Sequence, residues 1–585
     1  MGKYEKIIEL ARRRGFFWPS AEIYGGVRGF IDFGPLGCLL KRNIIEKWRK
    51  FFVYPHQDFI VEIETPIIMP AKVFEASGHV EHFTDYIVEC LKCGRKFRAD
   101  HLIEEQTGLS GLEKYSEREL TEIIRKYGVK CPECGGELSK VRKFNLLFKT
   151  VIGPYGGNIG YARPETAQGM FISFKRVYEV VRRKLPLGIA QVGKVLRNEI
   201  SPRQGPIRLR EFTIMEIELF FDPTNPKCSL IEEVKEDVLR ILPAERIVKG
   251  LKEPMELTVE EYLERKIISN EWLAYFMTVG QRFIESLGIP REKQLFIEKL
   301  PEERAHYAAQ TFDQTVHVDR WGWIEVAGHA YRTDYDLKRH MKFSGEDLRA
   351  FEPYPKPKVY RRKTIRLNYR RIGPKFRGRI KELEELIKNL SGEEIESLIE
   401  KIEKEGKVKV GEFILTKEDF TIIVEEHVES GRRFIPHVSE PSYGVERVLY
   451  VTLEYAYTEK EGRIVLKLPP DIAPIKVAVF PLLSREPYVS KAKEIYRMIV
   501  SENILCLYDD AGSIGKRYAR ADEIGIPLAI TIDAETFEDN TVTLRDRDTW
   551  HQVRVPITQL TNIIKDYISL KITFKDLEKK YLRVK

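Results

Sequence analysis

Long apolar runs, a dense set of cysteines and a signal peptide are all missing from this 585-residue sequence. No run of about 18 apolar residues occurs, which argues against a membrane-spanning helix. The first fifteen residues lack the apolar core of a signal peptide. Seven cysteines, four of them in CxxC pairs, are too few for a secreted disulfide scaffold. We therefore expect a cytoplasmic protein with no membrane partner.

The two commonest nucleotide-binding loops are also absent. No GxGxxG follows a predicted strand, and GSIGKR at 512–517 lacks the earlier glycine that a P-loop requires. Any bound nucleotide must therefore be held by a different device. Disorder is excluded as the main state, because 43% of the residues are hydrophobic and 11% are aromatic. At ~150 residues per domain, the length predicts roughly four domains.

Positive charge is concentrated in one segment. The chain carries a formal net charge of +8, whereas residues 356–379 hold eleven basic residues and no acidic one, so the rest sums to −3. Tyr360, Tyr369 and Phe376 are interleaved with these cations. Such a segment favours a phosphate-backbone partner, although a solvated surface loop explains this feature equally well.

Hydrophobic spacing predicts the elements of a first domain. Residues 36–52 carry apolar side chains at helical spacing, and residues 59–63 alternate as in a strand. Pro66 has no N–H and therefore favours a sheet edge or an interface. Residues 189–199 and 208–221 are predicted as two strands joined by a turn-rich loop.

The second of these strands has two different faces. Met215, Ile217 and Leu219 alternate with residues 214, 216 and 218, and the last two of these are glutamates. One face can therefore pack on a core while the other presents carboxylates.

Later segments predict further units. Residues 226–300 look mainly helical and resemble an insertion. Residues 380–404 form an amphipathic helical stretch with a break at Ser391-Gly392. Residues 474–585 alternate strand and helix patterns, which indicates a small α/β module of its own.

Four cysteines have the spacing of a metal site. Cys90 and Cys93 form one CxxC unit and Cys131 and Cys134 form another, each followed by a glycine. Two such knuckles complete a tetrahedral shell of four sulfurs, which suits zinc, and unmetallated thiols are the alternative. A closed four-cysteine site is structural, because it leaves no open coordination position for catalysis.

Arginines and glutamates gather at the two predicted strand ends. Arg197 and Glu199 end one strand, and Arg208 and Arg210 begin its partner. In an extended chain residues i and i+2 share a face, so these side chains would surround one space. Arginine stays charged and binds phosphate with two parallel donors. A surface ion-pair ladder is the alternative explanation.

Three segments together resemble the motifs of class II aminoacyl-tRNA synthetases. The helix at 36–52 with the Pro66 strand is similar to the first motif, RNE…RLREF at 197–212 to the second, and GVER at 444–447 to the third. A closer resemblance to the glycyl-tRNA synthetases, in their homodimeric archaeal and eukaryotic form, covers most of the chain. The segments that carry it are YGGVRGFIDFGPLG (24–37), FRADHL (97–102), RPETAQG (163–169), RNEISPRQGPIRLREFT (197–213), EPSYG (440–444) and SIGKRYARADEIGIP (513–527).

The resemblance implies an α+β fold. A mixed antiparallel catalytic sheet of six or seven strands would carry helices and insertions, followed by a C-terminal α/β anticodon-binding domain. The implied parts are the catalytic domain with the first motif (1–88), a zinc-ribbon-like insertion (89–140), the catalytic domain with the second motif (141–224), a mainly helical insertion (225–304), more of the catalytic domain (305–345), a basic and helical insertion (346–420), the catalytic domain with the third motif (421–470) and the anticodon-binding domain (471–585).

The resemblance also implies a reaction. Glycine and ATP would form glycyl-adenylate, and the glycyl group would pass to the 3′-terminal ribose of tRNA(Gly). Arg197 would hold the α-phosphate, Arg208 and Arg447 the γ-phosphate end, and Phe212 would stack on adenine. Glu325 matches the acidic position that binds Mg²⁺, so the implied catalytic residues are Arg197, Arg447 and Glu325. The full implied ATP-binding set is Arg197, Asn198, Glu199, Arg208, Leu209, Arg210, Phe212, Glu325, Val326, Gly444 and Arg447.

Glycine recognition would need anions for the ammonium group and crowding where a Cβ would lie. The residues implied by resemblance are Arg98, Glu165, Glu211, Glu440 and Ser442. For tRNA, Lys516, Arg517 and Arg520 are candidate contacts in the C-terminal module. The basic segment 356–379 and the cysteine insertion are expected to bind the acceptor arm of the tRNA.

Two alternatives remain open at this stage. One is a non-catalytic synthetase-like subunit that binds nucleic acid, although all three motif arginines are present. The other is a class II synthetase for another small amino acid, such as serine, threonine or proline.

The segment AHYAAQTFD at 305–313 departs from the usual cysteine- and tryptophan-containing version in this family.

Overall fold

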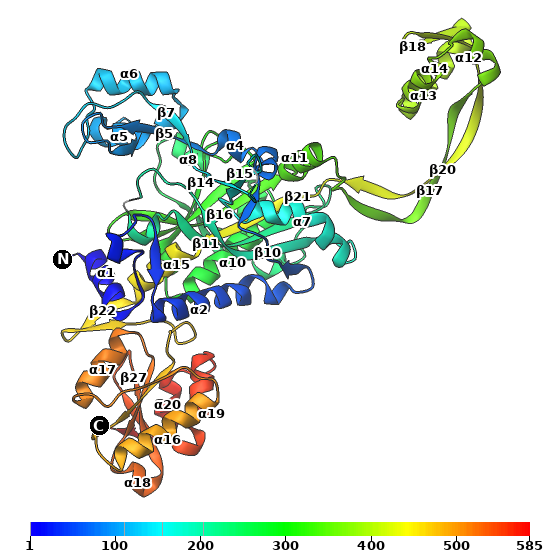
Figure 1. Cartoon of the computed structure of the whole chain (residues 1–585). Helices are drawn as coiled ribbons and strands as arrows, with labels where there is room; N and C mark the ends of the chain where they lie inside the picture. Colours follow the sequence, from blue (N-terminus) through cyan, green and yellow to red (C-terminus); the bar gives the residue numbers. More distant parts are fainter. Residues whose placement is uncertain (1, 110, 155, 203, 585) are drawn as a thin grey trace. The chain divides into compact units, whose positions relative to one another are not determined.

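A nine-stranded sheet forms the centre of the computed structural model, which describes residues 2–109, 111–154, 156–202 and 204–584 (Figure 1). Most neighbouring strands are antiparallel, whereas β10 and β3 pair in parallel, as do β12 and β14. The strand order is β13 (Met255–Thr258), β12 (Val238–Leu242), β14 (Gln294–Glu298), β15 (Gln310–Val318), β16 (Gly322–Thr333), β21 (His437–Gly444), β11 (Glu211–Phe221), β10 (Leu187–Leu196) and β3 (Ile60–Glu62).

The predicted strand pair is confirmed as β10 and β11, but its connection is longer than expected. The antiparallel register runs from Leu187 opposite Phe220 to Leu196 opposite Glu211. Residues 197–210 therefore lie in the loop rather than in the strands. Pro202 and Pro206 lack the N–H that a ladder requires, and Gly205 has a positive φ of 57°. The pairing ends at Arg210, which donates its N–H to the Gly29 carbonyl oxygen and not to β10, and the prolines and Gly205 shape the loop beyond it.

The two faces of β11 are buried against different partners. Met215, Ile217 and Leu219 belong to the main hydrophobic core. This face packs against α2 (Pro35–Phe52), α10 (Glu271–Ser286) and α15 (Val445–Ala456). The predicted 36–52 helix is α2, which begins with Pro35 in its first turn, where the missing N–H costs no hydrogen bond.

The opposite face of β11 carries Glu216 and Glu218, and it is also buried. Next to this face lies α7 (Ala167–Val180), which contacts both β10 and β11. The alternation that the sequence predicted is therefore present, but the carboxylate face does not meet solvent. Carboxylates in such a position require partners, because burying an isolated charge is costly.

The segment 226–300 differs from its prediction as a mainly helical insertion. It contains α8 (Ala244–Val248), α9 (Val259–Glu264) and α10, but also β12, β13 and β14. These three strands extend the central sheet beyond β15 and bring it from the expected six or seven strands to nine. They are only four or five residues long, and such short apolar runs become strands through pairing with neighbours that local spacing does not reveal.

The cysteines lie in a separate small subdomain. Its three-stranded sheet has the order β6 (Lys96–Arg98), β5 (Thr84–Glu89) and β7 (Arg142–Asn145), covered by α5 (Ala99–Thr107) and α6 (Glu117–Tyr127). We call residues 84–145 the cysteine subdomain. Ser116 and Glu119 form a reciprocal capping box that starts α6.

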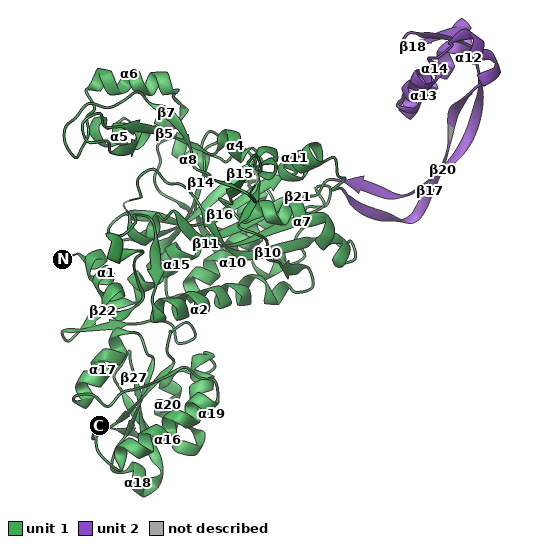
Figure 2. Cartoon of the chain, in the orientation of Figure 1, with its two compact units in different colours: residues 1–348, 435–585 green, residues 349–434 purple. Residues whose placement is uncertain are grey.

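Residues 349–434 form a compact unit of their own, coloured purple in Figure 2. Its long ribbon pairs β17 (Ala350–Leu367) with β20 (Phe420–Phe434), and its helices include α12 (Tyr369–Lys375), α13 (Ile380–Lys388) and α14 (Gly392–Glu405). Ser391 caps α14, which explains the predicted break. The basic run is therefore not a simple loop, because most of its first half is a strand that faces glutamates, such as Arg361 opposite Glu426.

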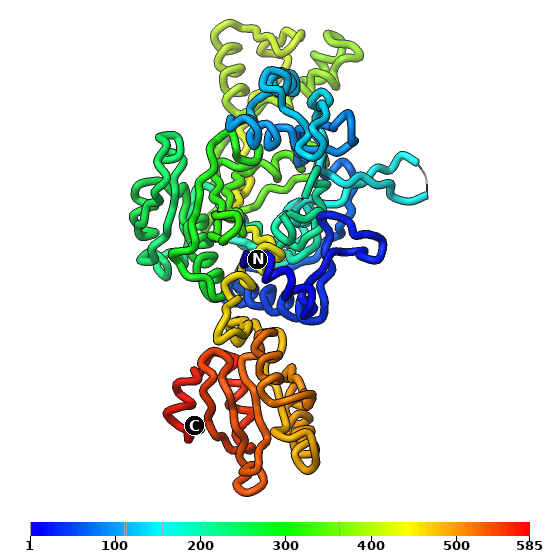
Figure 3. The backbone as a smooth tube through the Cα atoms, turned by 90° about the vertical axis from the view of Figure 1, so that its left-hand side faces the viewer, coloured from blue at the N-terminus to red at the C-terminus, as the bar shows by residue number. Residues whose placement is uncertain are grey.

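The C-terminal residues fold into the expected α/β module, shown in orange and red in Figure 3. Its six-stranded sheet has the order β25 (Cys506–Tyr508), β24 (Val477–Pro481), β26 (Leu528–Ile532), β27 (Thr541–Asp546), β28 (Gln552–Pro556) and β29 (Arg583–Val584). Helices α16 (Tyr488–Ser501), α17 (Ile514–Glu523) and α19 (Ile557–Ile568) pack on it through apolar side chains. In the described part of the chain, no helix has both the length and the apolar character to cross a membrane.

Candidate active site

A cavity of about 240 Å³ opens on the carboxylate face of the central sheet. Its walls come from β11, β15, β16 and β21, from the loop between β10 and β11, and from the first turn of α15. One end is lined by Arg197, Arg208 and Arg447, whereas Glu165, Glu216 and Glu440 also line the cavity. Cationic and anionic side chains from distant parts of the sequence therefore share one space.

Arg197 is held in place by two rings and one carbonyl. Its guanidinium lies 5.2 Å from the ring centroid of Phe212 and 5.7 Å from that of Phe83. Its Nε donates a hydrogen bond of 3.1 Å to the Pro164 carbonyl oxygen. Among the hydrogen bonds and ion pairs of the described residues, its terminal nitrogens have no carboxylate partner. Such nitrogens bind a phosphate through two parallel hydrogen bonds.

Arg208 and Arg447 are tied to different walls. Arg208 donates to Glu199 at 2.8 Å. Arg447 donates to the Ile207 carbonyl oxygen at 2.8 Å, and to both the carbonyl oxygen and the carboxylate of Glu325 at 3.0 Å. Arg447 thus links α15, which begins within the third motif, to the loop of the second motif, and it holds together two residues that are 240 positions apart.

Next to Glu325 lies a second carboxylate, Asp313, which is paired with Lys299 at 3.2 Å. Burial, together with the negative charge of Glu325, raises the pKa of Asp313 to about 7. Asp313 and Lys299 both line the cavity, and the sequence prediction contained neither. Two carboxylates are oxygen donors of the hard kind that Mg²⁺ prefers, so the donor set fits this ion.

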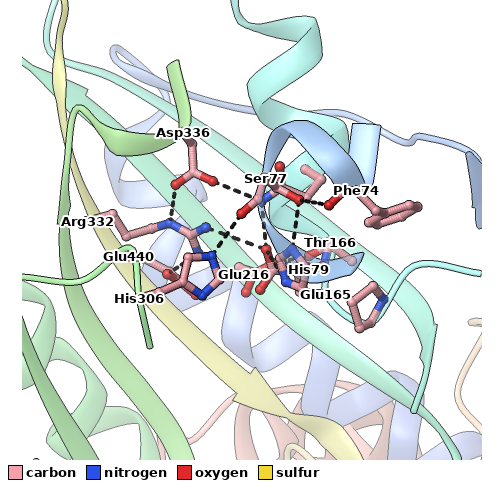
Figure 4. Close-up of polar contacts among 12 residues, drawn as sticks. Phe74, Ser77, His79, Glu165, Thr166, Glu216, His306, Arg332, Asp336 and Glu440 are labelled. Carbon is pink, nitrogen blue, oxygen red and sulfur yellow. Dashed lines mark hydrogen bonds and ion pairs between the residues drawn. The ribbon is translucent and has the colours of Figure 1, made fainter. Parts of the chain in front are cut away.

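The acidic end of the cavity is organised around one buried arginine, Arg332, which is 0% exposed (Figure 4). Arg332 donates to Asp336 at 2.9 Å and to Glu440 at 2.8 Å, and it lies 3.5 Å from Glu165. The ring of Tyr307 stacks over its guanidinium, 3.7 Å from centroid to Cζ. A fixed internal cation therefore positions the carboxylates that face the cavity.

The carboxylates at this end are not equivalent. Burial alone would raise the pKa of Glu165, but the charges of His79 and Arg332 hold this pKa well below its usual range. Burial dominates at Glu440 and raises its pKa well above the usual range. Glu216 accepts hydrogen bonds from the Thr166 N–H at 3.1 Å and from the Thr166 hydroxyl. These bonds fix the direction of the Glu216 carboxylate.

Most of the residues expected from sequence do lie around this cavity. Of the expected ATP-binding set, the lining includes Arg197, Glu199, Arg208, Leu209, Phe212, Glu325, Val326, Gly444 and Arg447. Of the expected glycine-binding set, it includes Glu165, Glu440 and Ser442.

Four expected residues lie outside the lining. Glu211 pairs with Lys194 at 2.9 Å, because it alternates with Phe212 and so lies on the opposite face of β11. The side chain of Arg210 donates to the backbone oxygens of Glu199 and Arg28. Asn198 donates its N–H to the Leu146 carbonyl oxygen.

The fourth, Arg98, is held by Asp100 at 2.8 Å and by Asp85 at 3.4 Å. It lines a second cavity of about 220 Å³ between the cysteine subdomain and the loop that follows β10. Glu199 and Arg208 line both cavities. The Arg208–Glu199 ion pair therefore forms part of the wall between them.

Glu216 and Arg332 were not expected at this site from the sequence. The signal for Glu216 was visible, since it is one of two glutamates that alternate with large apolar residues in a predicted strand. Arg332 had no comparable signal, because its partners come from three other elements: Glu165 before α7, Asp336 in α11 (Tyr335–Ser344) and Glu440 in β21.

The four cysteines of the two CxxC units come together in the cysteine subdomain. Their sulfur atoms all lie within 4.8 Å of one another, with Cys90 and Cys134 at 3.5 Å and Cys93 and Cys131 at 3.7 Å. A tetrahedron with metal–sulfur bonds of about 2.3 Å has sulfur–sulfur edges of about 3.8 Å. The arrangement therefore fits a four-coordinate metal ion such as zinc.

Known proteins that are similar to this chain agree with one another in their described function. An anticodon-binding domain family matches residues 476–567. The chain is 54% identical over 578 residues to the glycine–tRNA ligase of Aeropyrum pernix, covering 98% of each chain. It is 50% identical over 567 residues to that of Pyrococcus furiosus, covering 97% of this chain and 99% of the relative. It is 47% identical over 571 residues to that of Methanocaldococcus jannaschii, covering 96% and 98%.

Proposed function

The chain belongs to the glycine–tRNA ligase family, and from this premise we propose how its cavity divides the two substrates. As a member of that family it is an ATP-dependent ligase that joins glycine to tRNA. This identity leaves a non-catalytic subunit, or a synthetase for another small amino acid, without support. The arginine end of the cavity binds ATP, and the carboxylate end binds the ammonium group of glycine.

This assignment rests on the presence of both positive and negative side chains in one cavity. Arg197, Arg208 and Arg447 line it together with Glu165, Glu216 and Glu440. A triphosphate needs several fixed cations, whereas a zwitterionic amino acid needs an anion for its ammonium and a cation for its carboxylate. Glycine bound with its ammonium at the glutamates would point its carboxylate toward Arg197 and the α-phosphate.

The first step follows from this placement. The glycine carboxylate attacks the α-phosphorus, pyrophosphate leaves, and negative charge develops on the phosphate oxygens. Arg197 is positioned to stabilise that charge without reorganisation, while Arg208 and Arg447 hold the leaving pyrophosphate. Glu325 and Asp313 would hold Mg²⁺, which neutralises phosphate charge when bound. The ribose hydroxyl of tRNA then takes the glycyl group, and AMP leaves.

Pyrophosphate exchange with each of the twenty amino acids in turn tests the assignment. The full chain is expected to exchange pyrophosphate into ATP with glycine and to give a much lower rate with alanine. Rejection of alanine should come from crowding near Tyr307, whose ring packs on Arg332 beside the glutamates. Exchange with serine, threonine or proline in preference to glycine would overturn the assignment.

We propose that the four cysteines bind a structural zinc ion. Zinc removal by a chelator, or the Cys131→Ser change, is expected to lower the melting temperature and tRNA charging while most glycine-dependent exchange remains. None of the four cysteines is among the residues that line the catalytic cavity, and structural zinc contributes folding energy to its own subdomain. Cys38→Ser, at an exposed free cysteine, is the matched control. Protein purified with zinc present that carries no zinc would contradict the proposal.

We propose that the unit at 349–434 contacts the tRNA acceptor arm through exposed arginines of its basic segment. Arg370 and Arg377 are exposed, whereas Arg371 is paired with Glu418 at 2.8 Å. Each phosphate contact contributes roughly one to the slope of log affinity against log salt. Changing Arg370 and Arg377 together to Gln should lower that slope by about one to two, and Arg371→Gln should change it less. A tRNA affinity that is insensitive to salt in the unaltered chain would contradict this role.

We propose that the chain forms a homodimer and acts in the cytoplasm. A homodimer would form at α2 and at the edge strand β3, where Leu39 and Ile45 are half-buried and β3 ends the central sheet. An unpaired sheet edge is a ready surface for a second copy. Location in the cytoplasm, where charged tRNA is used, is the second proposal.

A further inference from the structure

Glu218 is a buried carboxylate with no assigned role. It is 0% exposed, and neither of its carboxylate oxygens has a hydrogen-bond partner among the described residues. The nearest cation, Arg332, approaches one oxygen only to 4.0 Å. Glu218 is not among the residues that line the cavity, so it cannot touch a ligand there directly.

The sheet register places Glu218 behind Glu440. Glu216 lies opposite Ser442, and Leu219 lies opposite Ser439. Glu218 therefore faces Glu440 on the neighbouring strand. The carboxylate oxygens of Glu216, Glu218 and Glu440 all come within 4.8 Å of one another, and two of these three residues line the cavity.

Charge in this region is unbalanced. Five carboxylates come from four parts of the fold. They surround the guanidinium of Arg332, and the buried guanidinium of Arg163 also faces Glu216. The imidazole of His79 of α4 (His79–His82) lies 3.5 Å from Glu165, and that of His340 interacts with Asp336. The ring of Tyr307 covers Arg332. These carboxylates are Glu216 and Glu218 of β11, Glu440 of β21, Asp336 of α11 and Glu165 before α7.

Buried like charges at this spacing do not all ionise. Burial, followed by the negative charge of Glu440, raises the pKa of Glu218 well above its usual range. The pKa of Glu440 is raised as well, mainly by burial. A proton held between these two groups would supply the hydrogen bond that the Glu218 oxygens otherwise lack.

We propose that Glu218 and Glu440 share one proton while the amino-acid end is empty, and that the ammonium group of bound glycine displaces this proton to solvent. The step breaks one O–H bond, and water or buffer accepts the proton; the ammonium group keeps all three of its own protons. Glu218 is thus a positioning residue that acts through Glu440. The inference rests on the proposed function, because it requires that the ammonium binds at these glutamates.

The test is calorimetric titration of glycine into the full chain, at one pH, in buffers of different ionisation enthalpy. Phosphate and Tris differ widely in this property, so a released proton makes the measured enthalpy depend on the buffer. We expect the dependence to correspond to between about 0.5 and 1 proton per glycine. In addition, glycine affinity should rise with pH below the shared pKa, by at most tenfold per pH unit, because binding releases one proton.

Glu218→Gln retains the shape and an N–H that can donate to Glu440, but it cannot hold the titratable proton. This variant should bind glycine with an enthalpy that no longer depends on the buffer and with a flatter pH profile. Glu256→Gln, at an exposed strand position paired with Arg240, should behave as the unaltered chain does. The result for the unaltered chain stands by itself if the Glu218 variant fails to fold.

Failure of the inference and failure of the proposed function have different outcomes. Glycine binding and exchange with an enthalpy independent of buffer would overturn the shared proton and leave the proposed function intact. No glycine binding and no glycine-dependent exchange would overturn the proposed function itself. A dependence on chelator instead of buffer would show that a metal ion occupies the three carboxylates, which also contradicts the shared proton.

Discussion

Arg197→Ala is expected to lower glycine-dependent pyrophosphate exchange by about 10²- to 10³-fold, the effect of removing one preorganised donor from developing negative charge. Arg197 is held between the rings of Phe212 and Phe83 and by the Pro164 carbonyl. Its guanidinium is therefore in place before the substrates react. Because the interaction strengthens as charge develops on the α-phosphate, kcat should fall more than the KM values rise.

Two variants make this result interpretable. Arg197→Lys retains a positive charge but loses the planar fork, so it should recover only part of the activity. Arg176→Ala, at a position on α7 whose side chain is 88% exposed, controls for the removal of an arginine as such. Full exchange activity in folded Arg197→Ala would show that another group stabilises the transition state.

Glu216→Gln should raise the KM for glycine by roughly 100-fold, with a much smaller change in the KM for ATP. Removing one partner of a buried charge pair costs about 2–5 kcal/mol, and Glu216 is 1% exposed. The amide is nearly isosteric and can still accept the hydrogen bonds from Thr166. The folded structure should therefore survive while the attraction for the ammonium group is lost.

The same change at Glu211 separates the structure from the sequence-based expectation. Glu211 lies on the opposite face of β11 in an ion pair with Lys194, and both side chains are about 40% exposed. Glu211→Gln should leave the glycine KM within about threefold, because exposed ion pairs contribute ~0–1 kcal/mol. Equal losses in the two variants would show that the ammonium does not bind at the cavity face.

Local sequence patterns were sufficient to predict several helices and strands. The α2 helix, the β10–β11 pair and the capped α14 helix follow from apolar spacing, alternation and the Ser391 cap. In such elements the hydrogen bonds and the buried side chains recur at short sequence intervals. A stretch of about ten residues is therefore enough to predict the helix or strand. The C-terminal module followed from the same alternation of strand and helix patterns.

The resemblance implied that Arg197, Arg208 and Arg447 share one site, and all three line one cavity. It did not determine on which face of a strand each side chain lies. A one-residue difference in parity moves a side chain to the other side of a strand. Glu211, which the resemblance implied at the glycine end, lies on the face of β11 opposite to Glu216. The exact ends of β10 and β11 decided which loop residues turn away, such as Arg210.

Short motifs in the sequence thus contained the residue types of both sites: arginines and glutamates for the cavity, and paired cysteines for the cysteine subdomain. Their assembly depended on contacts between residues separated by more than a hundred positions, such as Arg332 with Glu165 and Glu440, and Arg447 with Glu325 and Ile207. The physical reason is that burial and neighbouring charge set the protonation and direction of each carboxylate, and both exist only once the nine strands have paired.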